Sequence, residues 1–99
     1  MDRVKETFLT IRLKLGLHAR PAALFVQEAS RFKSVIKVSK DGFEINGKSV
    51  MGLMMLEAAN GVKLKVTAAG PDEAEAIAAM VNLFERGFGE EEDPPRAKR

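Results

Sequence analysis

The sequence contains no cysteine, no tryptophan, no tyrosine and only one histidine, His18. The lack of cysteine excludes disulfides, thiolate nucleophiles and cysteine-based zinc sites, and one histidine cannot by itself form a histidine-rich metal site. No apolar run approaches the roughly 20 residues that a membrane-spanning helix needs, and no signal peptide is recognisable. We therefore expect a cytoplasmic protein that is not inserted in a membrane and needs no metal or other cofactor.

Charge is nearly balanced, with a formal net charge of +2 over 99 residues. A weak positive field suits acidic partners or phosphate groups, but it falls well short of the basic surface of a nucleic-acid-binding protein. A chain of this length holds one modest core, so any chemistry should occur at its surface. We predict one domain over residues 1–89, followed by a disordered tail over residues 90–99, where charged residues and two prolines gather.

Four segments alternate apolar and polar residues, which is the pattern of strands with one buried and one solvent-exposed face. These segments are residues 9–15, 36–39, 43–45 and 62–68. Apolar residues recur at helical spacing in residues 20–32, 49–59 and 73–86. The order β-α-β-β-α-β-α predicts an α+β fold, an open-faced β-sandwich in which three helices cover one face of a four-stranded antiparallel sheet.

Basic residues occupy polar positions of these strands, among them Lys37, Lys63 and Lys65. We expect them on the solvent-exposed face of the sheet. An RNA-binding sheet would need exposed aromatic residues on that face. Because we expect Phe8 and Phe43 in the core, the sequence disfavours nucleic-acid binding.

The segment Gly16-Leu17-His18-Ala19-Arg20-Pro21-Ala22 lies where the first predicted strand gives way to the first helix. Proline is tolerated in a first helical turn, which places His18 just before the helix. The N–H groups of Ala19 and Arg20, together with the Arg20 guanidinium, would then attract an anion. An imidazole beside such donors could accept a phosphoryl group. A lone histidine can equally be an ordinary surface or core residue, so this pattern alone leaves both interpretations open.

Two motifs resemble the signatures of one family. The segment Leu17-His18-Ala19-Arg20-Pro21-Ala22 is similar to the active-site signature of the HPr family, the phosphocarriers of the bacterial phosphoenolpyruvate-dependent sugar phosphotransferase system. The segment Lys48-Ser49-Val50-Met51-Gly52-Leu53-Met54 is similar to that family's second signature. The resemblance extends over about residues 4–89, and the order of predicted elements fits it.

The resemblance implies that His18 accepts a phosphoryl group on Nδ1 from phospho-enzyme I and donates it to enzyme IIA components. Arg20 and the backbone amides of Ala19 and Arg20 would stabilise that group. The chain would then be a monomeric carrier rather than a stand-alone turnover enzyme. Two alternatives remain: a phosphocarrier of the nitrogen-regulatory branch, and a mainly regulatory paralogue, of a class that lacks the active-site histidine.

Ser49 has two compatible interpretations. Its position at the start of a short helix predicts an N-cap, whose hydroxyl accepts a hydrogen bond from a backbone N–H of the first turn. The resemblance implies that Ser49 is also a regulatory phosphorylation site. An HPr kinase/phosphorylase and a transcriptional regulator would then be further partners.

The second predicted helix is rich in methionine. A short helix has only one face against the sheet, so part of this set should be exposed, and flexible methionines suit surfaces that meet several partners. The resemblance implies that the first two helices form the docking face. The candidate docking residues are Ala23, Gln27, Val50, Met51 and Met54.

Overall fold

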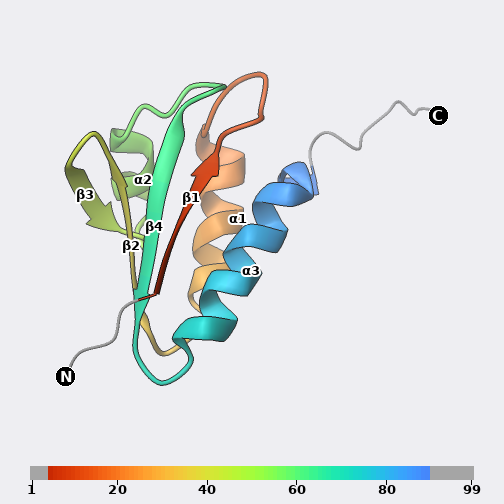
Figure 1. The fold of residues 1–99 in the computed structure, drawn as a ribbon. Helices are drawn as coiled ribbons and strands as arrows, with labels where there is room; N and C mark the ends of the chain where they lie inside the picture. The colour runs from red at the N-terminus through yellow and green to blue at the C-terminus, as the bar shows by residue number, and fades with distance from the viewer. Residues whose placement is uncertain (1–4, 90–99) are drawn as a thin grey trace.

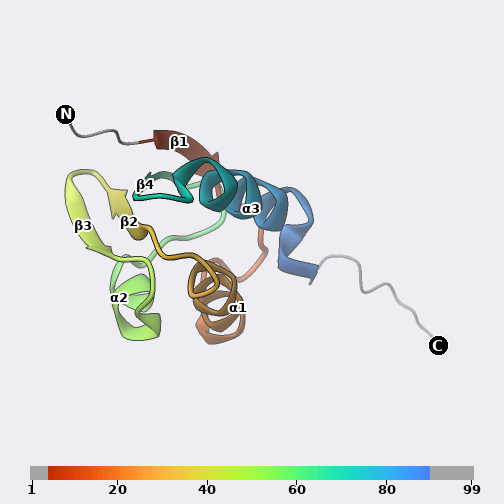
Figure 2. The ribbon, with the colours of Figure 1, turned by 90° about the horizontal axis from the view of Figure 1, so that it is seen from below.

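The computed structural model describes residues 5–89 and shows one antiparallel sheet with helices against one face (Figures 1 and 2). In chain order the elements are β1 (Lys5–Thr10), α1 (Ala19–Ala29), β2 (Val35–Lys40), β3 (Phe43–Asn46), α2 (Val50–Met55), β4 (Lys63–Ala69), α3 (Glu73–Glu85) and the short 3-10 helix η1 (Gly87–Gly89). The strands lie in the order β1-β4-β2-β3. The predicted architecture is confirmed, while the predicted tail 90–99 lies outside the described residues.

The core lies between the two central strands and the helices. From the sheet, Leu64, Val66 and Ala68 of β4 and Ile36 and Val38 of β2 are all buried, as the alternating pattern predicts. The helices contribute Ala22, Phe25, Ala29, Leu53, Ala76, Met80 and Phe84. The rings of Phe25 and Phe84 meet edge to face with their centroids 6.2 Å apart, so α1 and α3 pack directly against each other.

The opposite face of the sheet is exposed to solvent. Lys37 and Lys63 are exposed there, as predicted. The prediction that Phe8 and Phe43 lie in the core is wrong, because their side chains are 56% and 49% exposed. Phe8 pairs with Lys65 and points to the open face, one residue out of phase with Leu9, which pairs with the buried Leu64. Phe43 begins the edge strand β3, which has a neighbouring strand on one side only. The ring of Phe8 instead lies under the Lys63 ammonium, 5.9 Å from Nζ to the ring centroid.

The first strand begins and ends earlier than residues 9–15. β1 pairs with β4 from Lys5 to Thr10, and the ladder closes where the Ile11 N–H donates to the Val62 carbonyl at 2.8 Å. Ile11 and Leu13 are nevertheless buried. Their alternation therefore reflects a loop that packs into the core, which looks the same in the sequence as a paired strand.

The second helix is shorter than residues 49–59, because α2 ends at Met55. Beyond it, Glu57 takes a left-handed backbone conformation with φ of 51°. The Nζ of Lys40 donates to the carbonyl oxygens of Leu56 and Glu57 at 3.0 and 3.1 Å. These bonds give the carbonyls at the end of the helix a partner, so the chain can leave the helical path.

Candidate functional site

His18 is the N-cap residue of α1, as the sequence predicts. Its backbone is extended, with φ −86° and ψ −169°, and its carbonyl accepts the first helical hydrogen bond from the Ala22 N–H at 3.0 Å. Pro21 occupies the first turn and has no N–H to offer. The amides of Ala19 and Arg20 precede the first helical donor, so neither has an acceptor within the helix. Both residues are exposed, and amides at a helix N-terminus can donate hydrogen bonds to an anion.

The loop before α1 is held against the segment that follows α2. The Leu17 N–H donates to the Ala58 carbonyl oxygen at 2.8 Å, and the His18 N–H donates to the Gly16 carbonyl at 2.9 Å. Gly16 has a φ of +73°, and a Cβ at this position would lie 2.8 Å from the Ala58 oxygen. Glycine is therefore required here both by conformation and by the close approach of two backbones.

The His18 side chain lies half-buried at this junction. A shallow hollow beside it is lined by Leu15, Leu17, Glu57, Ala58 and Ala59. The Nε2 atom is buried, while the residue as a whole keeps part of its surface in solvent. One edge of the ring is therefore buried, while the residue keeps part of its surface accessible from outside.

Lys40 positions the histidine indirectly, and the sequence analysis did not identify it. Its two hydrogen bonds fix the start of the segment after α2, and Ala58 in that segment holds Leu17. Lys40 lies at the end of β2, far from His18 in the sequence. No local pattern links them, because the contact arises only when β2, α2 and the first loop come together.

Ser49 is the N-cap of α2, as predicted. Its hydroxyl oxygen accepts a hydrogen bond from the Gly52 N–H at 3.0 Å. It is half-buried, so the hydroxyl lies close to the surface at the helix start. The segment that touches His18 follows the other end of this six-residue helix, which spans roughly 9 Å. Ser49 therefore does not line the hollow beside His18.

The candidate docking residues differ in exposure. Met51 is 76% exposed and Met54 is also exposed, whereas Leu53, which points to the core, is buried. Gln27 is exposed, and Ala23 and Val50 are half-buried. Helices α1 and α2 pack side by side on one face of the sheet (Figure 2). Met55 and Leu15, which the sequence analysis did not single out, add exposed apolar surface to this end of the molecule.

A second polar junction ties the start of β2 to the start of α3. The Asp72 carboxylate accepts hydrogen bonds from the Ser34 hydroxyl at 2.5 Å, the Lys33 N–H at 2.8 Å and the Ser34 N–H at 2.9 Å. The Ser34 hydroxyl first, and the backbone N–H of Lys33 next, lower the pKa of Asp72 below its usual 3.8. This junction stabilises the fold at the end of α1 opposite to His18.

Two kinds of site find no support in the part of the chain that the structure describes. Across residues 5–89, no group of three or more histidine, cysteine, aspartate or glutamate side chains is placed to hold a metal ion. Within the same residues, no helix is both long and apolar enough to cross a membrane.

Comparisons with known proteins agree with this geometry. A family model described as the PTS HPr component phosphorylation site matches residues 5–86. The phosphocarrier protein HPr of Neisseria meningitidis is 52% identical over 79 residues, which are 80% of this chain and 89% of that protein. The HPr-like protein Crh of Halalkalibacterium halodurans is 48% identical and covers 82% of this chain and 96% of its own length. A crystal structure of HPr from Thermoanaerobacter tengcongensis superposes with a TM-score of 0.83 at 54% identity, covering 86% of this chain and 96% of that one. The chain therefore belongs to the HPr family of phosphocarrier proteins of the phosphotransferase system.

Proposed function

We propose that the protein carries a phosphoryl group on Nδ1 of His18, accepting it from phospho-enzyme I and donating it to enzyme IIA components. The observation that carries this proposal is the position of His18 at the N-cap of α1, beside the first-turn amides of Ala19 and Arg20. The burial of Nε2 supports Nδ1 as the acceptor, because a buried ring nitrogen is harder for an incoming donor to reach. This transfer would take place in the cytoplasm.

The transfer needs few groups from this chain. The Nδ1 lone pair attacks the phosphorus, a new N–P bond forms, and the bond from phosphorus to the donor atom of enzyme I breaks, while the imidazole proton stays on Nε2. The phosphoryl oxygens would receive hydrogen bonds from the amides of Ala19 and Arg20 and from the exposed Arg20 guanidinium. The reverse sequence delivers the group to enzyme IIA. An exposed site suits a group that must leave again.

The direct experiment is incubation with labelled phosphoenolpyruvate and enzyme I. Phosphohistidine is stable in base and hydrolysed in acid. Because the chain has a single histidine, a label with this behaviour is assigned to His18. We expect such a label on the wild-type protein and none on His18→Ala. A missing label, or an undiminished label on His18→Ala, would contradict the proposal.

A second candidate function is regulation through Ser49. Similarity to HPr-like proteins named Crh supports this candidate. A phosphate on the Ser49 oxygen would be stabilised by the α2 N-terminus and would add about two negative charges beside the exposed Met51. An HPr kinase/phosphorylase would add it, and a transcriptional regulator could then recognise it. This chain retains His18, so we regard regulation as additional to transfer. Transfer within the nitrogen-regulatory branch would use the same His18 chemistry with other partners.

Ser49 variants separate the two roles. Ser49→Asp keeps a side chain that can cap the helix and adds a negative charge. We therefore expect slower transfer from enzyme I without a large loss of stability. Ser49→Ala loses the bond to Gly52, worth about 1 kcal/mol, and should transfer at the wild-type rate. An unchanged rate in Ser49→Asp would refute the regulatory role.

Docking would involve the exposed apolar surface of α2 and the neighbouring face of α1. We propose that Met51 and Met54, with Val50, Ala23 and Gln27, contact enzyme I. We also propose that the protein works as a monomer, although a solved structure of a relative from Thermoanaerobacter tengcongensis is described as an HPr dimer. Light scattering at micromolar concentration should give the monomer mass of 10.8 kDa. A dimer at that concentration would contradict the monomer.

A further inference from the structure

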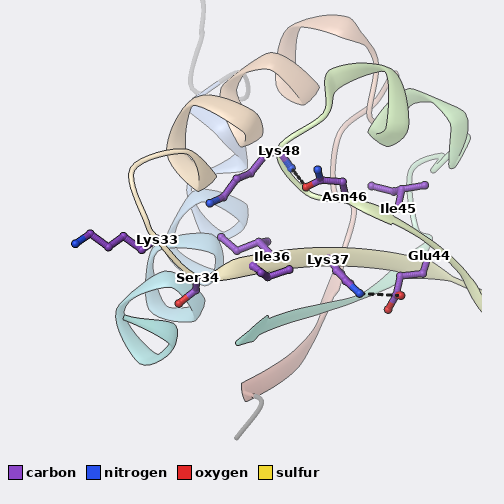
Figure 3. Close-up of a pocket in the computed structure, with 9 residues that line it drawn as sticks. Lys33, Ser34, Ile36, Lys37, Glu44, Ile45, Asn46 and Lys48 are labelled. Atoms are coloured by element: carbon purple, nitrogen blue, oxygen red, sulfur yellow. Dashed lines mark hydrogen bonds and ion pairs between the residues drawn. The ribbon is translucent and has the colours of Figure 1, made fainter. Parts of the chain in front are cut away.

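A hollow of about 400 Å³ lies at the start of β2, beside the end of β3 (Figure 3). Its volume is in the range of small-molecule sites. It is separated from His18 by the length of α1, whose 11 residues span roughly 16 Å. A ligand here would therefore not compete for space with a phosphoryl group at the other end of the helix.

The hollow carries net positive charge. Lys33, Lys37 and Lys48 line it together with a single acid, Glu44. The Lys37 Nζ lies 3.7 Å from the Glu44 carboxylate, and both side chains are half exposed, so this ion pair is weak and can open to a ligand. The nearby Asp72 carboxylate is occupied by three donors at the start of β2.

Two polar groups of the hollow are held in place. The Lys48 Nζ donates to the Phe32 carbonyl at 2.7 Å, which fixes the long side chain with two of its N–H bonds left over. The Lys48 N–H donates to the Asn46 Oδ1 at 2.9 Å, and this bond leaves the Asn46 amide nitrogen as a donor. In Figure 3, Lys48 and Asn46 lie above β2 and Lys37 lies below it, so donors approach the hollow from two sides.

The hollow also has apolar surface. Val35 is exposed and Ile45 is half-buried, whereas Ile36 beneath them is fully buried and offers a ligand no surface. A ligand that fits must therefore combine an anionic group with a small apolar body.

We propose that this hollow binds a small phosphomonoester, with its phosphate held by the lysines at the start of β2 and its carbon body against Ile45. Lysine binds phosphate as a point charge, and three lysines facing one acid match the dianion of a phosphomonoester better than the single charge of a carboxylate. The site would let the carrier respond to a phosphorylated small molecule while His18 remains available for transfer.

The test is an amide NMR titration of the full chain with phenyl phosphate. We expect saturable shifts at residues 33–37 and 44–48, tighter binding than inorganic phosphate, and no saturation with benzyl alcohol. Lys37→Gln should weaken binding about 3- to 10-fold, and Glu44→Gln should strengthen it about 3-fold, because it removes the one competing carboxylate. Lys63→Gln, on the open face of the sheet, is the matched control and should leave the affinity unchanged.

Two results would overturn the proposal. Shifts confined to residues 18–22 would mean that phosphate binds only at the start of α1. An equal loss of affinity in Lys63→Gln and Lys37→Gln would mean that any surface lysine attracts the anion. Because His18→Ala leaves the hollow intact, this titration and the enzyme I labelling can fail independently.

Discussion

The backbone N–H of Leu17 donates to the carbonyl oxygen of Ala58 at 2.8 Å, and this bond joins the loop before α1 to the segment after α2. His18, which follows Leu17, is therefore positioned both by α1, which it caps, and by the segment that follows α2. The close approach of the two backbones depends on Gly16, and the path of the Ala58 segment depends on Lys40. Both residues should affect transfer without touching the phosphoryl group.

Gly16→Ala should be destabilising and should slow transfer. The new Cβ would lie 2.8 Å from the Ala58 oxygen, and the residue would keep a left-handed backbone, so we expect a loss of roughly 2 kcal/mol or more in urea unfolding. Gly61→Ala is the matched control. Gly61 has a φ of +93° but no atom within 4 Å of its added Cβ, so it should lose only about 1 kcal/mol and transfer normally. Equal effects of the two changes would show that the contact with Ala58 is unimportant.

Lys40→Met removes the ammonium while keeping most of the side chain. The Leu56 and Glu57 carbonyls would lose a charged donor, which should lower the free energy of unfolding by about 1–3 kcal/mol. The segment that holds Leu17 would loosen, and transfer from enzyme I should slow about 10-fold. Lys65→Met on the open face should change stability by less than about 0.5 kcal/mol. A normal transfer rate in Lys40→Met would contradict the positioning role.

Arg20→Gln should reduce transfer while leaving stability unchanged. Arg20 is exposed at the start of α1, so its loss removes a charged donor to the phosphoryl oxygens but no core contact. We expect a decrease of roughly 10- to 100-fold in the rate constant for transfer, measured by rapid quench. Arg31→Gln, beyond the other end of the same helix, is the control and should transfer at the wild-type rate. If both variants behave alike, Arg20 does not contact the phosphoryl group.

Asp72 should make stability depend on pH in the acidic range. Its pKa is lowered in the folded protein, so its contribution to stability is complete above the unfolded value of about 3.8 and is lost as the pH falls toward the lower folded value. Urea unfolding between pH 6 and pH 2.5 should therefore show a steeper loss of stability for the wild type than for Asp72→Asn. Asp41→Asn, in the exposed β2–β3 turn, should keep the wild-type slope. Parallel curves for wild type and Asp72→Asn would contradict this role.

The fold and the two helix caps could be predicted because they depend on local sequence. Alternation marks β2 and β4, and His18 and Ser49 precede apolar segments with helical spacing. Phe8 was misplaced by its apolar character, since its position one residue before Leu9 puts it on the open face. Phe43 was misplaced because alternation does not reveal which strands lie at the edges of the sheet. The roles of Lys40 and Ala58 could not be predicted from the sequence, because their contacts join residues far apart in the chain.

The most direct test of the central claim is an NMR measurement of the phosphorylated protein with nitrogen-15 in the histidine ring. After incubation with phosphoenolpyruvate and enzyme I, we predict phosphorus–nitrogen coupling to Nδ1 of His18 and loss of that signal when an enzyme IIA domain is added. Coupling to Nε2, phosphate on another residue, or a phosphoryl group that enzyme IIA cannot remove would contradict the account.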